Sequence, residues 1–169
     1  MLRSRSTLPA LALLSLAGCG GSAGGDDTTG PAAERFTATL AGSSVVPATA
    51  STSTGTITFE ARDSTLRYSL SVANMTGITQ AHLHNAAAGA NGATLVWLLP
   101  VNGNAAQVPS VPLDGVISIG DIAPGWVRGT PRLAMDSVKA LMRAGRLYVD
   151  IHSSAFGAGE VRGQVARMP

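Results

Sequence analysis

The chain has 169 residues, of which 45% are hydrophobic, 13% charged and only 4% aromatic, a size that suits one folded domain and is short for two. Twenty glycines and nine prolines indicate many turns, so the composition argues against a helical bundle and favours short strands. The net charge of +2 depends on Arg3 and Arg5, because without them the twelve basic residues fall to ten and equal the ten acidic ones. No basic surface for nucleic acid remains.

The first part of the chain has the organisation of a bacterial export signal. A basic start precedes an apolar run over 8–16, which is too short to span a bilayer. Leu16-Ala17-Gly18-Cys19 resembles the lipobox of bacterial lipoproteins, which implies cleavage before Cys19 and a lipid on its sulfur. Cys19 is the only cysteine, and a lone thiol in an oxidising compartment is a liability unless it is modified. We predict a signal peptide over 1–18 and a membrane anchor at Cys19.

Residues 19–34 are rich in Gly, Asp, Thr, Ser and Ala and contain no large apolar side chain. Such a segment cannot bury enough surface to offset the entropy of ordering the chain. We expect a flexible tether here and a folded domain over 35–169. Gly20, in place of an acidic residue after the cysteine, resembles the pattern sorted to the outer membrane of bacteria that have two membranes. The expected location is the cell envelope, outside the cytoplasm.

The rest of the chain has mainly the period-two pattern of β-strands. Apolar and polar side chains alternate in most segments, and the continuous apolar run Leu95–Leu99 is typical of a strand covered on both faces. We expect strands over 36–40, 55–61, 66–72, 80–84, 95–99, 116–119, 147–152 and 161–165. The segment 101–113 is predicted to be a loop, and the Gly-containing segment 86–92 a flexible surface turn.

One segment has helical spacing instead. Its apolar residues are Met135, Val138, Leu141 and Met142. Asp136 near its start and Arg143 before Gly145 are typical of helix ends. We expect a helix over 135–144 that covers an open edge or end of the sheet. The predicted fold class is all-β, an antiparallel β-sandwich of about eight short strands with one short helix.

The last two strands predict their own register. The pairs expected across this hairpin are His152 with Glu160, Asp150 with Arg162, and Tyr148 with Gln164. These residues lie on the face opposite Leu147, Val149 and Ile151, so a shift of one residue would turn the charges into the core. We therefore expect the apolar residues inside, and a ladder of polar pairs outside the hydrophobic interior.

The residues that indicate chemistry are the three histidines, each on the polar face of an expected strand. His82 and His84 are two residues apart, hence on one side of a strand, at roughly 7 Å along the backbone. They can converge on one metal ion, and His152 can add a third nitrogen if its strand lies near. Glu160 is then a candidate acceptor for the other ring N–H of His152. Three imidazoles suit zinc or copper. The alternative is that these histidines are surface residues bonded to their neighbours.

Other chemistries lack their motifs. The sequence contains no Gly-x-Ser-x-Gly elbow, no phosphate-binding loop and no Cys-x-x-Cys pair. Asp150 and Glu160 are a candidate carboxylate pair for acid–base chemistry. Asp150 is explained more simply by its expected partner Arg162. We assign no catalytic residue and favour a non-enzymatic role.

Several separated motifs resemble those of the CHRD domain, named for chordin. They are Phe36-Thr37-Ala38-Thr39-Leu40-Ala41-Gly42 with Val46-Pro47, Ala81-His82-Leu83-His84 with Gly92, Leu147-Tyr148-Val149-Asp150-Ile151-His152, and Gly159-Glu160-Val161-Arg162-Gly163-Gln164. The resemblance covers roughly 35–165 and implies an extracytoplasmic β-sandwich, without assigned catalytic residues. Asp150 stands where the family more often has Asn.

The His-x-His strand is also similar to the copper-binding strand of Cu/Zn superoxide dismutase. That likeness is local, because three histidines are too few for a bridged two-metal site, and one cysteine cannot form that family's disulfide. Two hypotheses follow. The first is a lipid-anchored binding or envelope-structural module whose partner is a protein or a glycan. The second is a protein that binds one copper or zinc ion through His82, His84 and His152.

Overall fold

The computed structural model describes residues 33–100 and 111–169. The predicted signal peptide, the lipidation site Cys19, nearly all of the tether and most of the loop expected over 101–113 lie outside the described residues. The elements in chain order are β1 (Arg35–Ala41), η1 (Gly42–Ser44), β2 (Thr54–Ala61), β3 (Leu66–Met75), β4 (Ile78–Asn85), β5 (Ala93–Leu99), β6 (Leu113–Ile122), η3 (Pro124–Trp126), α1 (Met135–Arg143), β7 (Leu147–Ser153), β8 (Val161–Gln164) and β9 (Ala166–Arg167).

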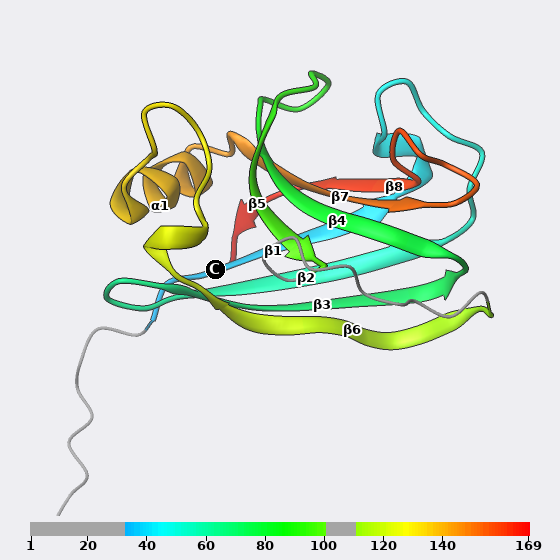
Figure 1. Cartoon of the computed structure of the whole chain (residues 1–169), viewed down its shortest axis with the longest axis horizontal. Coiled ribbons are helices and arrows are strands. Elements are labelled where there is room, and N and C mark those ends of the chain that lie inside the picture. The colour runs from blue at the N-terminus through cyan, green and yellow to red at the C-terminus, as the bar shows by residue number, and fades with distance from the viewer. Residues whose placement is uncertain (1–32, 101–110) are drawn as a thin grey trace, which may run out of the picture. The chain divides into compact units, whose positions relative to one another are not determined.

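The strands form one antiparallel sheet in the order β5-β4-β7-β8-β1-β2-β3-β6, with β9 beside β1 (Figure 1). β1 joins the two halves, because it pairs with β2 along its length and with β8 through Ala41 and Arg162. At the two ends of the sheet, the Ser118 hydroxyl of β6 donates to the Leu98 carbonyl of β5 at 2.7 Å. The all-β class with one short helix is confirmed. The strands expected in a sandwich belong to a single, nearly closed, barrel-like sheet.

The core consists of the apolar residues that alternate along these strands. Its largest fully buried aromatic and aliphatic side chains include Phe36, Leu40, Ile57, Phe59, Tyr68, Leu70, Leu83 and Leu98. The residues of β7 that were expected inside, Leu147, Val149 and Ile151, are completely buried. Because burial of one such side chain contributes roughly 1.5–3 kcal/mol, this shared inner face fixes which side chains of β4 and β7 point the other way.

Helix α1 ends one residue before the expected boundary and packs at one end of the sheet (Figure 1). Its buried residues are Met135, Val138, Lys139 and Met142. The Lys139 ammonium donates to the carbonyls of Arg62, at 2.7 Å, and Asp63, at 2.8 Å, in the turn between β2 and β3. The helix is thereby attached to that hairpin. Among the described residues, no helix has the length and apolar character needed to cross a bilayer.

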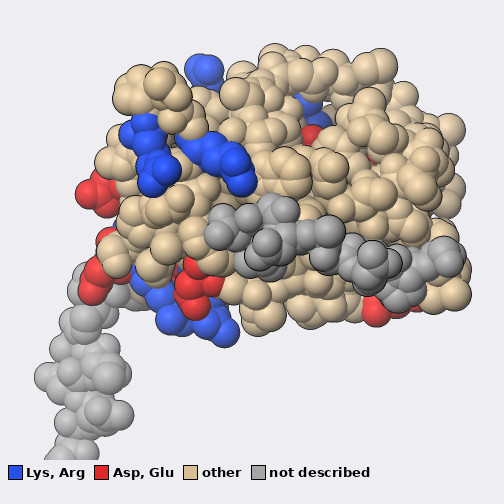
Figure 2. Space-filling model, in the orientation of Figure 1, with Lys and Arg blue, Asp and Glu red and all other residues tan. Residues whose placement is uncertain are grey.

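Glu34, the residue expected to end the tether, contacts α1 and β9. Its carboxylate accepts hydrogen bonds from Arg143, the shorter at 2.8 Å, and forms an ion pair with Arg167 at 3.2 Å. The hydrogen bond from Arg143 is the main reason why the pKa of Glu34 is lowered, against the effect of burial. Figure 2 shows acidic and basic side chains mixed at the end of the molecule where α1 lies, and few charges over the rest of that face.

The polar face of β7 is covered rather than exposed, which differs from the expectation. Tyr148 and Asp150 are both buried. The segment 86–92, expected to be a flexible surface turn, is attached to β8: Arg162 donates to the Ala90 carbonyl at 2.8 Å, and Gln164 donates to the Ala86 carbonyl at 3.0 Å. Tyr148 and Asp150 on this face of β7 are therefore removed from water, and their polar groups need partners within the protein.

Candidate metal centre

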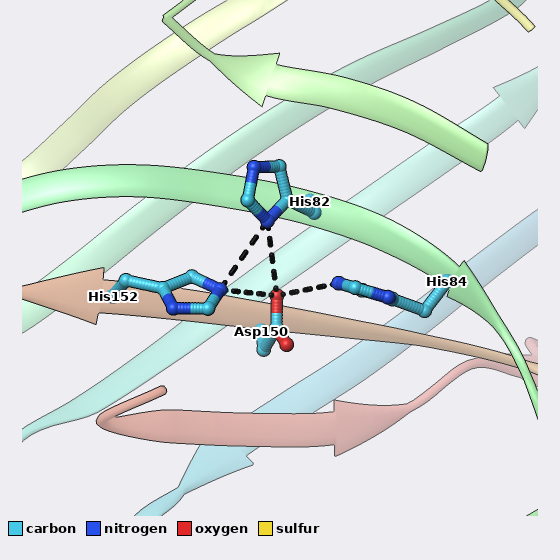
Figure 3. A group of neighbouring side chains, drawn as sticks. All are labelled: His82, His84, Asp150 and His152. Carbon is cyan, nitrogen blue, oxygen red and sulfur yellow. Dashed lines mark hydrogen bonds and ion pairs between the residues drawn. The ribbon is translucent and has the colours of Figure 1, made fainter. Parts of the chain in front are cut away.

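The pairing of β4 with β7 brings the three histidines together. In this antiparallel register His82 lies opposite Asp150, His84 opposite Tyr148, and Gln80 opposite His152. Since alternate residues share a face, His84 and His152 are the diagonal neighbours of the central His82–Asp150 pair. Figure 3 shows the four side chains pointing toward one another from these two strands.

Three ring nitrogens surround one oxygen of Asp150. Oδ1 of Asp150 lies 3.1 Å from Nε2 of His84, 3.3 Å from Nε2 of His152 and 3.7 Å from Nδ1 of His82. Nδ1 of His82 and Nε2 of His152 are 3.2 Å apart. The four atoms all lie within 4.8 Å of one another, so they can share one ion.

Backbone carbonyls fix two of the rings from behind. Nδ1 of His84 lies 2.9 Å from the Gly92 carbonyl oxygen, and Nδ1 of His152 lies 3.0 Å from that of Gly157. A carbonyl only accepts, so each Nδ1 carries its hydrogen and donates it. Nε2 of each ring then faces Asp150, as a hydrogen-bond donor when the ring is protonated and as a lone pair when the ring is neutral. In metal sites, a histidine commonly donates one ring N–H to a carbonyl, and this bond orients the other ring nitrogen toward the ion.

Gly92 is required where its carbonyl meets His84. A Cβ added at this position would collide with the backbone carbonyl of Asn85. The glycine therefore allows the segment 86–92 to return close enough to β4 for its carbonyl to reach the imidazole.

Aromatic rings pack against two of the histidines. The Tyr148 ring is stacked on His84, with centroids 4.7 Å apart and planes at 3°. Trp97 of β5 lies edge-on to His82 with centroids 4.7 Å apart. Nε2 of His82 is buried and has no hydrogen-bond partner among the described residues. The outer nitrogen of His82 thus faces packed side chains, while its Nδ1 faces the cluster.

Burial and the central carboxylate determine the protonation of the cluster. Burial lowers the pKa of His82 to about 4, although the charge of Asp150 opposes this effect. Burial would raise the pKa of Asp150, but hydrogen bonds from His152 and His84 outweigh it and lower that pKa to about 2. Burial would also lower the pKa of His152, yet its bond to Asp150 raises it. Near neutral pH, the carboxylate is ionised and the His82 ring is uncharged.

The structure differs from the sequence analysis in the partners of Asp150, Arg162, Glu160 and His152. The register Asp150↔Arg162 is as expected, but Asp150 faces the histidines, and the Arg162 guanidinium donates to Asn91 and to backbone carbonyls of 86–92. Glu160 accepts from the Ser51 hydroxyl at 2.8 Å, and the ring N–H of His152 is taken by Gly157. The bend of 153–159 brings that carbonyl to the ring, so no bond from His152 to Glu160 forms among the described residues.

Asp150 is the cluster member that sequence reasoning did not assign to the metal. A signal for it was present, because Asp150 and His152 form an Asp-x-His pattern on one strand face that matches the His-x-His pattern of the other strand. The expected ion pair with Arg162 accounted for Asp150 equally well from the sequence.

The match to known families decides the classification. The family model of the CHRD domain matches residues 36–165. The chain belongs to the CHRD domain family. No curated protein and no solved structure matches it. All four residues of the cluster lie within the CHRD match, on the paired strands β4 and β7.

The donor set of this CHRD domain fits a divalent transition-metal ion. Imidazole nitrogen is a preferred ligand of zinc and copper, and a carboxylate oxygen completes zinc sites at about 2.0–2.2 Å from the ion. Three imidazoles and one carboxylate would leave a complex with a divalent ion at a net charge of about +1. The packed rings and fixed carbonyls hold these donors in place before any ion arrives.

Proposed function

We propose that this CHRD domain binds one divalent transition-metal ion, zinc or copper, between β4 and β7. The ligands are Nδ1 of His82, Nε2 of His84 and His152, and Oδ1 of Asp150. The observation that carries the proposal is that two rings fixed from behind by carbonyls aim their Nε2 atoms at the same carboxylate oxygen, at 3.1 and 3.3 Å.

At these distances, each nitrogen that faces the carboxylate needs a proton or a metal ion between them. A lone pair of a neutral imidazole and a carboxylate oxygen repel each other at hydrogen-bond distance, and burial of the cluster strengthens that repulsion. Protons on Nε2 relieve it in the metal-free protein, whereas a metal ion relieves it for all the donors at once. Without a cation, the facing lone pairs destabilise the folded protein. With a bound metal ion, the same atoms act as ligands and stabilise it.

Metal analysis tests the proposal. The full chain carrying Cys19→Ser, which removes a competing thiolate, is loaded with zinc or copper and freed of excess metal. We expect close to one ion per chain, and its loss in His82→Ala and Asp150→Asn. Asp121→Asn is the matched control, because Asp121 is a half-exposed carboxylate that pairs with Arg67 on the other half of the sheet. A folded Cys19→Ser chain that retains no ion would refute the proposal.

For the setting of the domain, we propose a bacterial envelope lipoprotein, lipidated at Cys19 and carried on a tether that ends near Glu34. The lipobox-like sequence 16–19 supports this proposal. Labelling of Cys19 by a fatty-acid analogue in cells, and its absence in Cys19→Ser, would test it. Lack of label on the native chain would count against it.

A protein or glycan partner is the second candidate function. The observation that favours it is the exposed row of hydroxyls on β2, where Thr54, Thr56 and Thr58 all face outward. Replacement of all three by Ala should abolish capture of such a partner by immobilised protein while metal content stays the same. Unchanged capture would remove this surface as the candidate.

A further inference from the structure

We infer that the ion in this site is a structural zinc in a closed, tetrahedral shell that admits no outside ligand. The inference rests on the metal binding proposed above and adds the class of ion, its geometry and its role. Three observations carry it: the spacing of the donors, their burial and the strands that they join.

Three of the donors are spaced like one face of a tetrahedron. With metal–ligand bonds of about 2.0–2.1 Å, the edge of a tetrahedral shell is about 3.3 Å, whereas a square plane needs neighbours at about 2.9 Å and opposite donors at about 4.1 Å. Nδ1 of His82, Nε2 of His152 and Oδ1 of Asp150 lie 3.2, 3.3 and 3.7 Å from one another, although any three donors of a square plane include an opposite pair. Nε2 of His84 lies 3.1 Å from Oδ1, and all four donors lie within 4.8 Å of one another. Copper(II) prefers the square arrangement, and it exceeds zinc in intrinsic affinity, so geometry is what selects zinc.

The burial of the donors leaves no open coordination position. The side chains of His82, His84, Asp150 and His152 are 6%, 10%, 11% and 14% exposed. Catalytic zinc keeps one position for water or substrate, whereas structural zinc has four protein ligands. Here the protein supplies four donors, and the Trp97 and Tyr148 rings pack against two of them.

The site also joins parts of the chain that are distant in sequence. Two donors come from β4 and two from β7, strands that are paired although β5, β6, η3 and α1 separate them along the chain. An ion bound here would link the two paired strands. Its binding would therefore raise the free energy of unfolding.

Cobalt(II) is the probe for coordination geometry. The cobalt-loaded Cys19→Ser chain should show the strong visible absorption of four-coordinate cobalt, and the spectrum should not change when azide is added in large excess. Asp150→Ala, which removes one donor, should bind cobalt more weakly and show a spectrum that azide shifts. Since Asp150→Ala can fail to fold, Asp150→Asn and His152→Gln are measured beside it, with far-ultraviolet circular dichroism as the check of folding.

The outcomes separate this inference from the proposed function. A weak spectrum of five- or six-coordinate cobalt, or an azide shift in the parent chain, would overturn the closed tetrahedral shell while metal binding stood. Absence of bound cobalt in the folded parent chain would overturn both. Zinc should also raise the melting temperature of the parent chain and leave that of His82→Ala unchanged. An equal rise in both would contradict the structural role.

Discussion

The guanidinium of Arg162 lies 3.5 Å from the centroid of the Tyr148 ring, and the same ring is stacked on His84. Arg162 also donates to the carbonyl of Ala90, two residues before the Gly92 carbonyl that accepts from His84. One buried cation therefore contacts both the Tyr148 ring and the segment 86–92, which supplies the carbonyl that orients His84. A stack of a cation on an aromatic ring is strongest where water is excluded.

Arg162→Met should weaken metal binding without removing a ligand. The variant loses the stack on Tyr148 and the hydrogen bonds that hold 86–92, so His84 loses its fixed orientation; such changes behind a metal ligand typically cost about 10–100-fold in affinity. Affinity is measured by competition with a chelator. Arg67→Met is the control, because Arg67 is half-exposed and bound only to Asp121 among the described residues. Equal affinities of Arg162→Met and the parent chain would show that Arg162 does not position His84.

Gly92→Ala should disturb both the fold and the site. Its Cβ would collide with the Asn85 carbonyl, and overpacking of this kind costs typically about 1–3 kcal/mol. Urea denaturation of the metal-free chain measures the loss of stability, and chelator competition measures the loss of affinity. Gly125→Ala is the matched control, since a Cβ at Gly125 meets nothing within 4 Å. The prediction is wrong if both variants unfold at the same urea concentration.

Lys139→Met should destabilise the domain but leave the metal affinity unchanged. The ammonium is buried and donates to the carbonyls of Arg62 and Asp63, which the methionine leaves without these bonds; the expected cost is about 1–3 kcal/mol. Arg146→Met, at an exposed position after the same helix, should change stability little. Denaturation midpoints check the prediction, and a stability of Lys139→Met equal to that of the parent chain would contradict it.

Metal affinity should fall as the pH is lowered. The pKa of His152 is raised by its bond to Asp150, so the ring is protonated below that pKa and must lose its proton to bind the ion. Asp150, with a pKa of about 2, and His82, with a pKa of about 4, face this ring and stay deprotonated above pH 5. Affinity should therefore fall by up to tenfold per pH unit for each displaced proton. Competition from pH 5.5 to 8 tests this, and a flat profile would refute it.

Trp97 should report the ion by its fluorescence. Its ring lies 4.7 Å from that of His82, so a paramagnetic ion such as cobalt(II) bound at Nδ1 should quench its emission. The protein has two tryptophans, and Trp126→Phe leaves Trp97 as the single emitter. Quenching should saturate near one equivalent of cobalt, and His84→Ala, which lacks one donor, should need a higher cobalt concentration. Equal quenching curves for this variant and its parent would place the ion elsewhere.

Local patterns predicted the strands well because each pattern has one physical solution. The alternation of Leu147, Val149 and Ile151 with Tyr148, Asp150 and His152 allows one choice of inner face, and it fixes the register with β8 to within a two-residue shift. The bounds of α1 were predicted within one residue, because its apolar stripe and the residues typical of helix ends indicate the same segment.

The sheet order and the ligand set needed information that lies outside any one segment. The sequence of β4 does not indicate that β7 is its neighbour in the sheet. The pairing of His82 with Asp150 could therefore not be predicted. Asp150 had Arg162 as an equally suitable partner across the final hairpin. In the structure, Asp150 and Arg162 have different partners. Arg162 donates to carbonyls of the segment 86–92, and Asp150 lies among the three histidines.

The position of β1 has a consequence for how the domain assembles. The first strand of the domain lies in the middle of the sheet, and on one side its partners are the last two strands, β8 and β9. When the chain is made from its amino end, β1 is ready long before these partners exist, so the sheet remains unfinished until the final residues are available. Loss of even a short piece of the carboxyl end should thus trap an open, aggregation-prone chain.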